Sequence, residues 1–127
     1  MITLATLGGA TEQEVFDQVA KHLLAQKKRS GVKDADWVVT CMYRNDEGLK
    51  CAAGCLIADD EYYKDIEGSS WDVLVDEDVV PTENCLELIV ALQNIHDCEP
   101  VEEWRAALGK LASLYKLSAD ILTQYDA

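Results

Sequence analysis

The spacing of apolar residues constrains this fold more than any other sequence feature. Apolar side chains recur at the period of an amphipathic helix in three long stretches. These stretches predict helices at 11–28, about 82–97 and 100–115, and a shorter helix is predicted at 118–125. The link between the second and third helices is very short, so we expect them to pack as a helical hairpin.

The first helix carries signals at both ends. Thr11 followed by Glu14 predicts a capping box, in which each side chain bonds the backbone amide of the other residue. The basic residues 27–29 suit the negative end of a helix, and Gly31 is expected to stop it.

The segment between the helices contains a β-hairpin signal. Residues 36–43 are rich in β-formers, 45–48 form a turn signal, and 49–53 can return as a second strand. The predicted hairpin therefore spans about 36–53, and helices must cover one of its faces because two strands alone are marginally stable. Residues 71–80 fit either a short strand or an ordered loop.

The predicted fold class is α+β, mostly helical, with about four helices and one two-stranded antiparallel β-hairpin. The 127 residues predict a single acidic globular domain, 1–127. The sequence lacks a secretory signal and any run of about 20 apolar residues. These features indicate a soluble cytoplasmic protein that does not bind a membrane.

Five cysteines are present, and an odd number in an intracellular protein argues against a disulfide framework. A tetrahedral metal site is one alternative, and buried reduced thiols are the other. The candidate metal ligands are Cys41, Cys51, Cys55, His96 and Cys98.

Catalysis is not predicted. His96 and Asp97 could imitate a base and its orienting carboxylate beside a cysteine, but consecutive helical residues do not normally face each other. His96 is expected instead to occupy a helix C-terminus, where the dipole favours it. We predict no enzyme activity, no catalytic residues and no cofactor.

Charge is distributed very unevenly. The net charge is −13, yet residues 1–58 hold seven basic and seven acidic residues and are neutral. Residues 59–87, which we call the acidic segment, contain eleven carboxylates and one lysine. Such asymmetry predicts one negative face that binds a partner. Its expected partner-binding residues are Asp59, Asp60, Glu61, Asp65, Glu67, Asp72, Asp76, Glu77, Asp78, Glu83 and Glu87.

A motif of the form Cys-x-Tyr-Arg…Gly-x-Lys-Cys-Ala-x-Gly-x-Leu-Ile lies at the centre of the chain. Its residues are Cys41, Tyr43, Arg44, Gly48, Lys50, Cys51, Ala52, Gly54, Leu56 and Ile57. Flanking matches are Phe16, Asp17, Gln26, Arg29, Ser30, Tyr62, Glu67, Gly68, Leu92, Gln93, His96 and Asp97. Over about residues 12–98 the chain resembles a family of small proteins from bacteriophages and bacterial genomes that has no settled activity. The resemblance implies a phage or prophage setting.

The motif is interpreted as structural. The small residues 51–54 permit a close approach between the return strand and the next element. Arg44 is expected to pair with Asp97 or with an acid of the 59–61 run.

Three functions remain open. The favoured one is a non-enzymatic phage-type inhibitor of a host nucleic-acid-handling or defence system, such as restriction or CRISPR machinery. Its acidic face would imitate nucleic acid and bind a basic surface of a host protein in the host cytoplasm. Direct nucleic-acid binding is disfavoured by charge, and a homodimer is possible. The alternatives are a small Cys/His metal-binding protein or enzyme, and a housekeeping phage domain whose acidity serves solubility.

Overall fold

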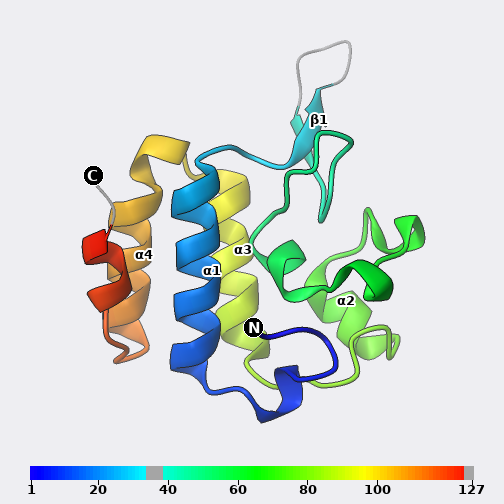
Figure 1. The fold of residues 1–127 in the computed structure, drawn as a ribbon, viewed down its shortest axis with the longest axis horizontal. Coiled ribbons are helices and arrows are strands. Elements are labelled where there is room, and N and C mark those ends of the chain that lie inside the picture. Colours follow the sequence, from blue (N-terminus) through cyan, green and yellow to red (C-terminus); the bar gives the residue numbers. More distant parts are fainter. Residues whose placement is uncertain (34–38, 125–127) are drawn as a thin grey trace.

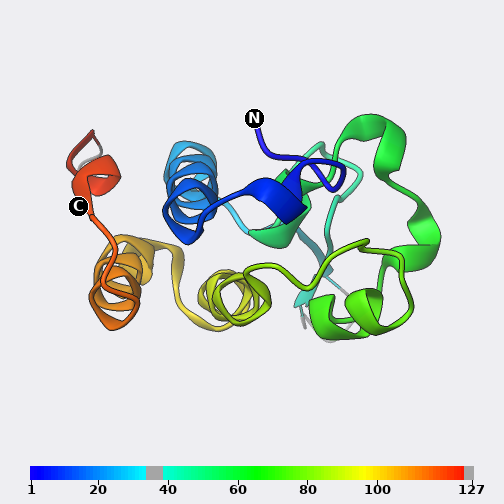
Figure 2. The same ribbon diagram turned by 90° about the horizontal axis from the view of Figure 1, so that it is seen from below.

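The computed structural model describes residues 1–33 and 39–124 of the chain. Three helices, α1 (Glu12–Gln26), α3 (Leu86–Cys98) and α4 (Trp104–Leu114), pack against one another. Figure 1 shows them side by side, and Figure 2 views them nearly end-on. These helices form one half of the molecule.

The other half consists of short elements on the side of α1 and α3 that faces away from α4 (Figures 1 and 2). Two short 3-10 segments, η5 (Val101–Glu103) and η6 (Asp120–Gln124), belong instead to the helical half. The elements of the second half are η1 (Leu7–Gly9), β1 (Gly31–Lys33), β2 (Val39–Cys41), η2 (Ala53–Leu56), η3 (Asp59–Glu61), η4 (Lys64–Ile66) and α2 (Trp71–Asp76).

The start of α1 confirms the predicted capping box. The Thr11 hydroxyl accepts a bond of 3.1 Å from the Glu14 amide, and the Glu14 carboxylate accepts one of 3.0 Å from the Thr11 amide. The helix ends at Gln26, inside the predicted 11–28, because Lys27 adopts a left-handed conformation with φ 52°. The chain therefore turns away before Gly31 is reached.

The other predicted helices also contain helical structure, with different ends. The predicted 82–97 begins later, at α3, because Cys85 is left-handed with φ 61° and forms its N-cap. The predicted 100–115 is divided into η5 and α4. The predicted 118–125 contains η6, and its residue 125 lies outside the described chain.

The predicted α+β class is wrong, because the described chain is mostly helical. Its only described strands, β1 and β2, have three residues each and pair antiparallel in the register Gly31 to Cys41. They are too short to contribute a sheet layer, and the molecule depends on helix packing for its core.

The hairpin predicted at 36–53 does not form. Residues 36–38 lie outside the described chain, and β2 pairs with β1, which precedes the predicted hairpin. The predicted return strand 49–53 contributes only an isolated bridge between Arg44 and Lys50. The chain then enters η2 instead of continuing as a strand.

Residues 71–80 were expected to form a strand or a loop, but they begin with α2. Trp71 and Leu74, one helical turn apart, are buried at 2% and 1% exposure, whereas Asp72 and Val73 are exposed. Burial of one helical face therefore outweighs the β preference of the valines.

Small residues after Lys50 permit the close approach that the sequence predicted. Cys51, Ala52 and Ala53 are fully buried, and Gly54 lies directly against the backbone of Tyr43. A Cβ atom at position 54 would lie 2.2 Å from the Tyr43 carbonyl oxygen, so only glycine fits there.

No helix among the described residues has the length and apolar character needed to cross a bilayer.

We predict that Gly54→Ala lowers the free energy of unfolding by about 1–3 kcal/mol, because a backbone oxygen must move to admit the methyl group. Urea unfolding followed by tryptophan fluorescence measures this change. Gly9→Ala is the matched control, since no atom lies within 4 Å of a Cβ placed there. Equal stability of the two variants would contradict the close approach at Gly54.

Candidate functional site

The flanking motif residue His96 is fully buried in the last turn of α3, and both of its ring nitrogens are hydrogen-bonded. Nε2 lies 3.0 Å from the amide nitrogen of Ser30, and Nδ1 lies 2.7 Å from Oδ1 of Asp97. Because an amide can only donate, Nε2 is the acceptor and the proton belongs on Nδ1. The ring also stacks on Trp104, with 5.5 Å between centroids.

One sequence expectation is confirmed here and another is wrong. His96 does lie at the end of a helix, but Asp97 bonds it directly, although neighbouring helical residues were expected to point apart. With both nitrogens occupied inside the core, the His96 ring has no free nitrogen that could act as a base. The pair is therefore a structural clamp between α3 and the chain before β1.

Arg29 and Gln93 extend this clamp. Arg29 was expected to suit the end of α1, but its guanidinium donates to the carbonyl oxygens of His96 and Glu99, at the end of α3. Gln93 donates to Asp97 at 3.0 Å and accepts from the amide of Ala53 at 2.9 Å. The network thus connects α3 to the segment that precedes β1 and to η2.

Helix α1 bonds the segment that leads into η2. Gln26 accepts from the Lys50 amide and donates to the Lys50 carbonyl, and His22 Nε2 lies 2.9 Å from that carbonyl. Burial lowers the pKa of His22 below its usual 6.5, while the bond to Lys50 acts in the opposite direction. His22 is therefore held in its neutral form more strongly than an exposed histidine.

A second group of hydrogen bonds among the motif residues converges on Glu67. Its carboxylate accepts from the amides of Tyr43 (2.8 Å) and Arg44 (3.1 Å) and from the Tyr62 hydroxyl (2.6 Å). Burial first and this bond second raise the pKa of Tyr62 to about 12. The Tyr43 hydroxyl in turn donates to the carbonyl of Ser69 at 2.6 Å, and burial raises its pKa.

Arg44 pairs with the 59–61 run, one of the two predicted possibilities. Its guanidinium lies 2.7 Å from Asp59 and 2.6 Å from the carbonyl of Ile57, and it covers the ring of Tyr62 at 5.0 Å. It thereby neutralises one carboxylate of the acidic segment. Because Asp59 is largely exposed, we assign this pair little stability.

Glu61 also turns inward. Its carboxylate accepts from the amides of Leu4, Ala5 and Ala58, at 2.9–3.0 Å. Burial tends to raise its pKa, but the three amide bonds outweigh burial and lower it. This carboxylate fastens the N-terminal segment to η3.

The eleven predicted partner-binding carboxylates therefore differ in their surroundings. Glu61 and Glu67 are partly buried and bond the backbone, and Asp59 is exposed but paired with Arg44. The other eight are exposed. They are Asp60, Asp65, Asp72, Asp76, Glu77, Asp78, Glu83 and Glu87.

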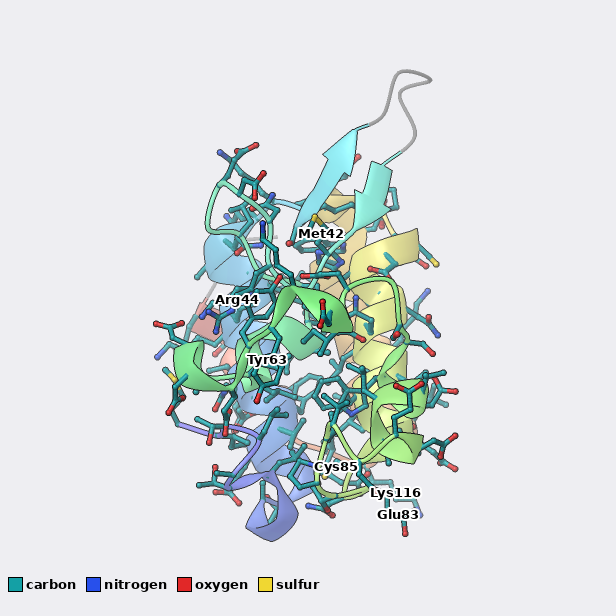
Figure 3. All side chains as sticks on the ribbon, turned by 90° about the vertical axis from the view of Figure 1, so that its right-hand side faces the viewer. Met42, Arg44, Tyr63, Glu83, Cys85 and Lys116 are labelled. Atoms are coloured by element: carbon teal, nitrogen blue, oxygen red, sulfur yellow. The ribbon has the colours of Figure 1, made fainter. Side chains whose placement is uncertain are left out.

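The exposed carboxylates of residues 59–78 belong to the second half of the molecule. The green ribbon of this stretch covers the side opposite α4 in Figures 1 and 2. Figure 3 faces that side, with Tyr63 near its middle and Glu83 at its lower edge. We call the exposed carboxylates of residues 60–83 the acidic surface; Glu87 lies apart from it, in the first turn of α3.

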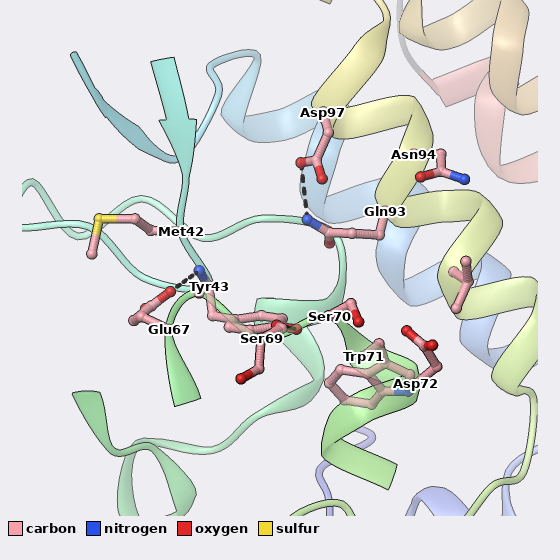
Figure 4. Close-up of a pocket in the computed structure, with 12 residues that line it drawn as sticks. Met42, Tyr43, Glu67, Ser69, Ser70, Trp71, Asp72, Gln93, Asn94 and Asp97 are labelled. Carbon is pink, nitrogen blue, oxygen red and sulfur yellow. Dashed lines mark hydrogen bonds between the residues drawn. The ribbon is translucent and has the colours of Figure 1, made fainter. Parts of the chain in front are cut away.

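A cavity of about 470 Å³ opens beside the acidic surface, between α3 and the chain that leads into α2. We call it the α2–α3 cavity, and Figure 4 shows its lining side chains. Tyr43 and Glu67 contribute from the motif, Trp71 and Asp72 from α2, and α3 provides the opposite wall. The cavity thus joins the buried motif network to the charged surface.

The thiols do not form a metal site with His96 in the described chain. Cys51 is buried and accepts from the Gly54 amide, and burial raises its pKa. Cys55 donates to the Ala52 carbonyl, and burial raises its pKa to about 12. Cys98 is exposed, and the side chain of Cys41 is outside the described part. No group of three or more potential ligands among the described residues could hold a metal ion.

Some site residues were not found from the sequence. Asn94, Val90 and Ser70 line the α2–α3 cavity, yet they belong to no recognisable motif. They become neighbours of Tyr43 only through tertiary packing. Gln93 and Asp97 were the signals on the α3 wall, as parts of the flanking motif.

Comparison with known proteins adds no further constraint, since no protein-family model, curated protein or solved structure matches the chain.

We predict that Glu67→Gln lowers the free energy of unfolding by about 1–3 kcal/mol. The glutamine side chain has one acceptor oxygen for the three donors that bond Glu67, and its NH₂ group would face at least one of those donors. Urea unfolding measures the loss. Asp65→Asn removes the same charge from an exposed position two residues away, and we expect a change within about 0.5 kcal/mol. Similar losses in both variants would mean that charge, and not hydrogen bonding, is responsible.

The lowered pKa of His22 predicts a pH-dependent stability. The unfolded chain binds a proton near pH 6.5 more readily than the folded chain, so stability falls as pH drops through 6.5 towards the lower folded pKa. His22→Gln removes the contribution of His22 protonation to this pH dependence. The stability of the variant should therefore decline less than that of the wild type between about pH 7 and pH 5. Parallel urea titrations across this range test the prediction, and identical slopes would refute it.

Proposed function

We propose that this chain is a binding protein whose acidic surface contacts a basic surface of a host protein. In a phage setting, the partner would belong to a nucleic-acid-handling or defence system, and the chain would inhibit it by occupying a groove built for nucleic acid. The observation that carries the proposal is the set of seven exposed carboxylates in residues 60–83, in a chain of net charge −13.

The scaffold beneath these carboxylates supports recognition of this kind. Glu61 and Glu67 lie before and after η4 in the chain, and their carboxylates accept from backbone amides of other segments, such as those of Ala58 and Tyr43. Trp71 and Leu74 anchor α2 in the core. Charges fixed on anchored elements lose less freedom on binding than charges on a loose tail. This distinguishes the acidic surface from a flexible solubilising segment.

The sign of the charge limits the partner class. A surface of this kind repels nucleic acid and anionic membranes and attracts cationic surfaces at long range. Complementary charge mainly increases the association rate and the specificity of binding. A nucleic-acid-binding host protein meets this requirement because it presents a cationic groove.

Apolar side chains on the same side provide short-range contacts. Tyr63 is 61% exposed between Tyr62 and Lys64, and Val73 is 37% exposed on α2. Tyrosine is enriched among the residues that dominate interface energies. We therefore include Tyr63 in the contact surface.

A charge-neutralising pair of triple variants tests the function. Asp76→Asn, Glu77→Gln and Asp78→Asn remove three charges from the acidic surface, and asparagine tolerates the left-handed backbone at position 78. Glu99→Gln, Glu102→Gln and Glu103→Gln remove three exposed charges from the helical half. Both variants have a net charge of −10, from −13 + 3.

Each immobilised protein is incubated with host lysate at about 0.1 M and about 1 M salt, between which the Debye length falls from about 10 Å to about 3 Å. We expect the wild type and the helical-half variant to retain a nucleic-acid-binding protein at low salt only. The acidic-surface variant should retain much less, and duplex DNA should release the captured protein. Capture that is indifferent to salt, to DNA or to the acidic-surface substitutions would refute the proposal and favour acidity for solubility alone.

A further inference from the structure

The α2–α3 cavity is large enough to receive a side chain of another molecule. Its volume of about 470 Å³ falls within the range of ligand pockets. Tyr43 and Trp71 contribute aromatic side chains, and Met42 and Val90 add apolar contacts. Met42 is flexible and polarisable, so it can adapt its shape to an occupant.

The charge of the lining is entirely negative. Glu67, Asp72 and Asp97 line the cavity, and neither lysine nor arginine is among its lining residues. Arg44, which follows the lining residue Tyr43, directs its guanidinium instead to Asp59 and to the carbonyl of Ile57. The cavity therefore favours a cation over a neutral or anionic group.

The lining carboxylates differ in what they can offer. Glu67 already accepts three bonds, and Asp97 accepts from His96 and Gln93. They act mainly as fixed negative charges. Asp72 is exposed at the start of α2 and Asn94 is exposed on α3, so these two side chains can bond an occupant directly.

Trp71 supplies an independent observation. The residue is 2% exposed, and its indole Nε1 has no hydrogen-bond partner in the structure. A buried donor without an acceptor is costly, and an acceptor brought by an occupant would relieve that cost. A guanidinium has no acceptor of its own, so only a backbone carbonyl of the peptide that carries the arginine would meet this donor.

We propose that the α2–α3 cavity receives an arginine side chain of the basic partner. Arginine fits better than lysine because its planar guanidinium stacks on aromatic faces, carries several donors and is weakly hydrated. The guanidinium meets Asp72 and Asn94 in the negative field of Glu67 and Asp97. This inference rests on the proposed function and assigns a specific anchor to it.

The test uses the full chain and the peptide acetyl-Gly-Arg-Gly-amide, titrated into ¹⁵N-labelled protein and followed by NMR. Peptides with lysine or citrulline in place of arginine are the ligand controls, and citrulline has nearly the same shape without the charge. We expect saturable shifts at Ser69, Ser70, Asp72 and Asn94 with the arginine peptide. The lysine peptide should bind more weakly, and the citrulline peptide should cause no saturable shift.

Asp72→Asn should weaken binding of the arginine peptide about tenfold, as expected for loss of a charged hydrogen bond. Asp76→Asn is the matched control, since it removes the same charge from the same helix outside the cavity lining, and it should bind as the wild type does. Both positions are exposed, so we expect both variants to fold as the wild type does. Unchanged NMR spectra of the variants without peptide, apart from the substituted positions, verify this.

Each other outcome is decisive. Equal binding of the citrulline peptide, equal loss in both variants, or shifts centred on residues 76–78 would overturn the cavity assignment, and equal binding of the lysine peptide would overturn the choice of arginine. If the peptide fails to bind but salt-dependent capture from lysate persists, only the cavity proposal fails. If the peptide binds in the cavity but lysate capture is absent, the proposed function fails and the cavity remains.

Discussion

The carboxylate of Glu67 is the interaction on which the half of the molecule outside the α1, α3 and α4 helices most depends. It accepts hydrogen bonds from two consecutive backbone amides, Tyr43 and Arg44, and from the hydroxyl of Tyr62. Charged acceptors form stronger hydrogen bonds than neutral ones, and three donors share this one. The chain that leaves β2 is thereby fixed to the start of the acidic segment.

This arrangement explains how so acidic a segment can fold. Eleven carboxylates within residues 59–87 repel one another, and only one lysine accompanies them. Glu61 and Glu67 direct their charges towards backbone amides, and Asp59 meets Arg44. The repulsion that remains belongs to exposed side chains, where water and salt screen it.

The sequence predicted local features well and non-local ones poorly. The capping box of Thr11 and Glu14 was found because its partners are three residues apart. The return strand at 49–53 was misassigned because burial of Gly54 against Tyr43, a tertiary contact, redirects the chain into η2. Local propensity contains no information about such a contact.

The site shows the same division. The sequence located the acidic segment, but it could not separate inward-facing Glu61 and Glu67 from exposed neighbours such as Asp60 and Asp65, because all are carboxylates in one run. The bond between His96 and Asp97 was not predicted, because consecutive residues of a helix usually point in different directions. These two side chains nevertheless bend towards each other and form a hydrogen bond. The cavity was not predictable, because its walls come from three separate segments.

These contacts also suggest a division of roles along the chain. The motif residues His96, Glu67 and Gly54 bond the backbone or pack against it. The exposed carboxylates Asp76, Glu77 and Asp78 lie outside the motif. A scaffold fixed by buried contacts can carry different surface charges without refolding, since exposed substitutions rarely change stability by more than about 0.5 kcal/mol. The motif residues therefore fix the scaffold, and the exposed carboxylates can vary without altering it.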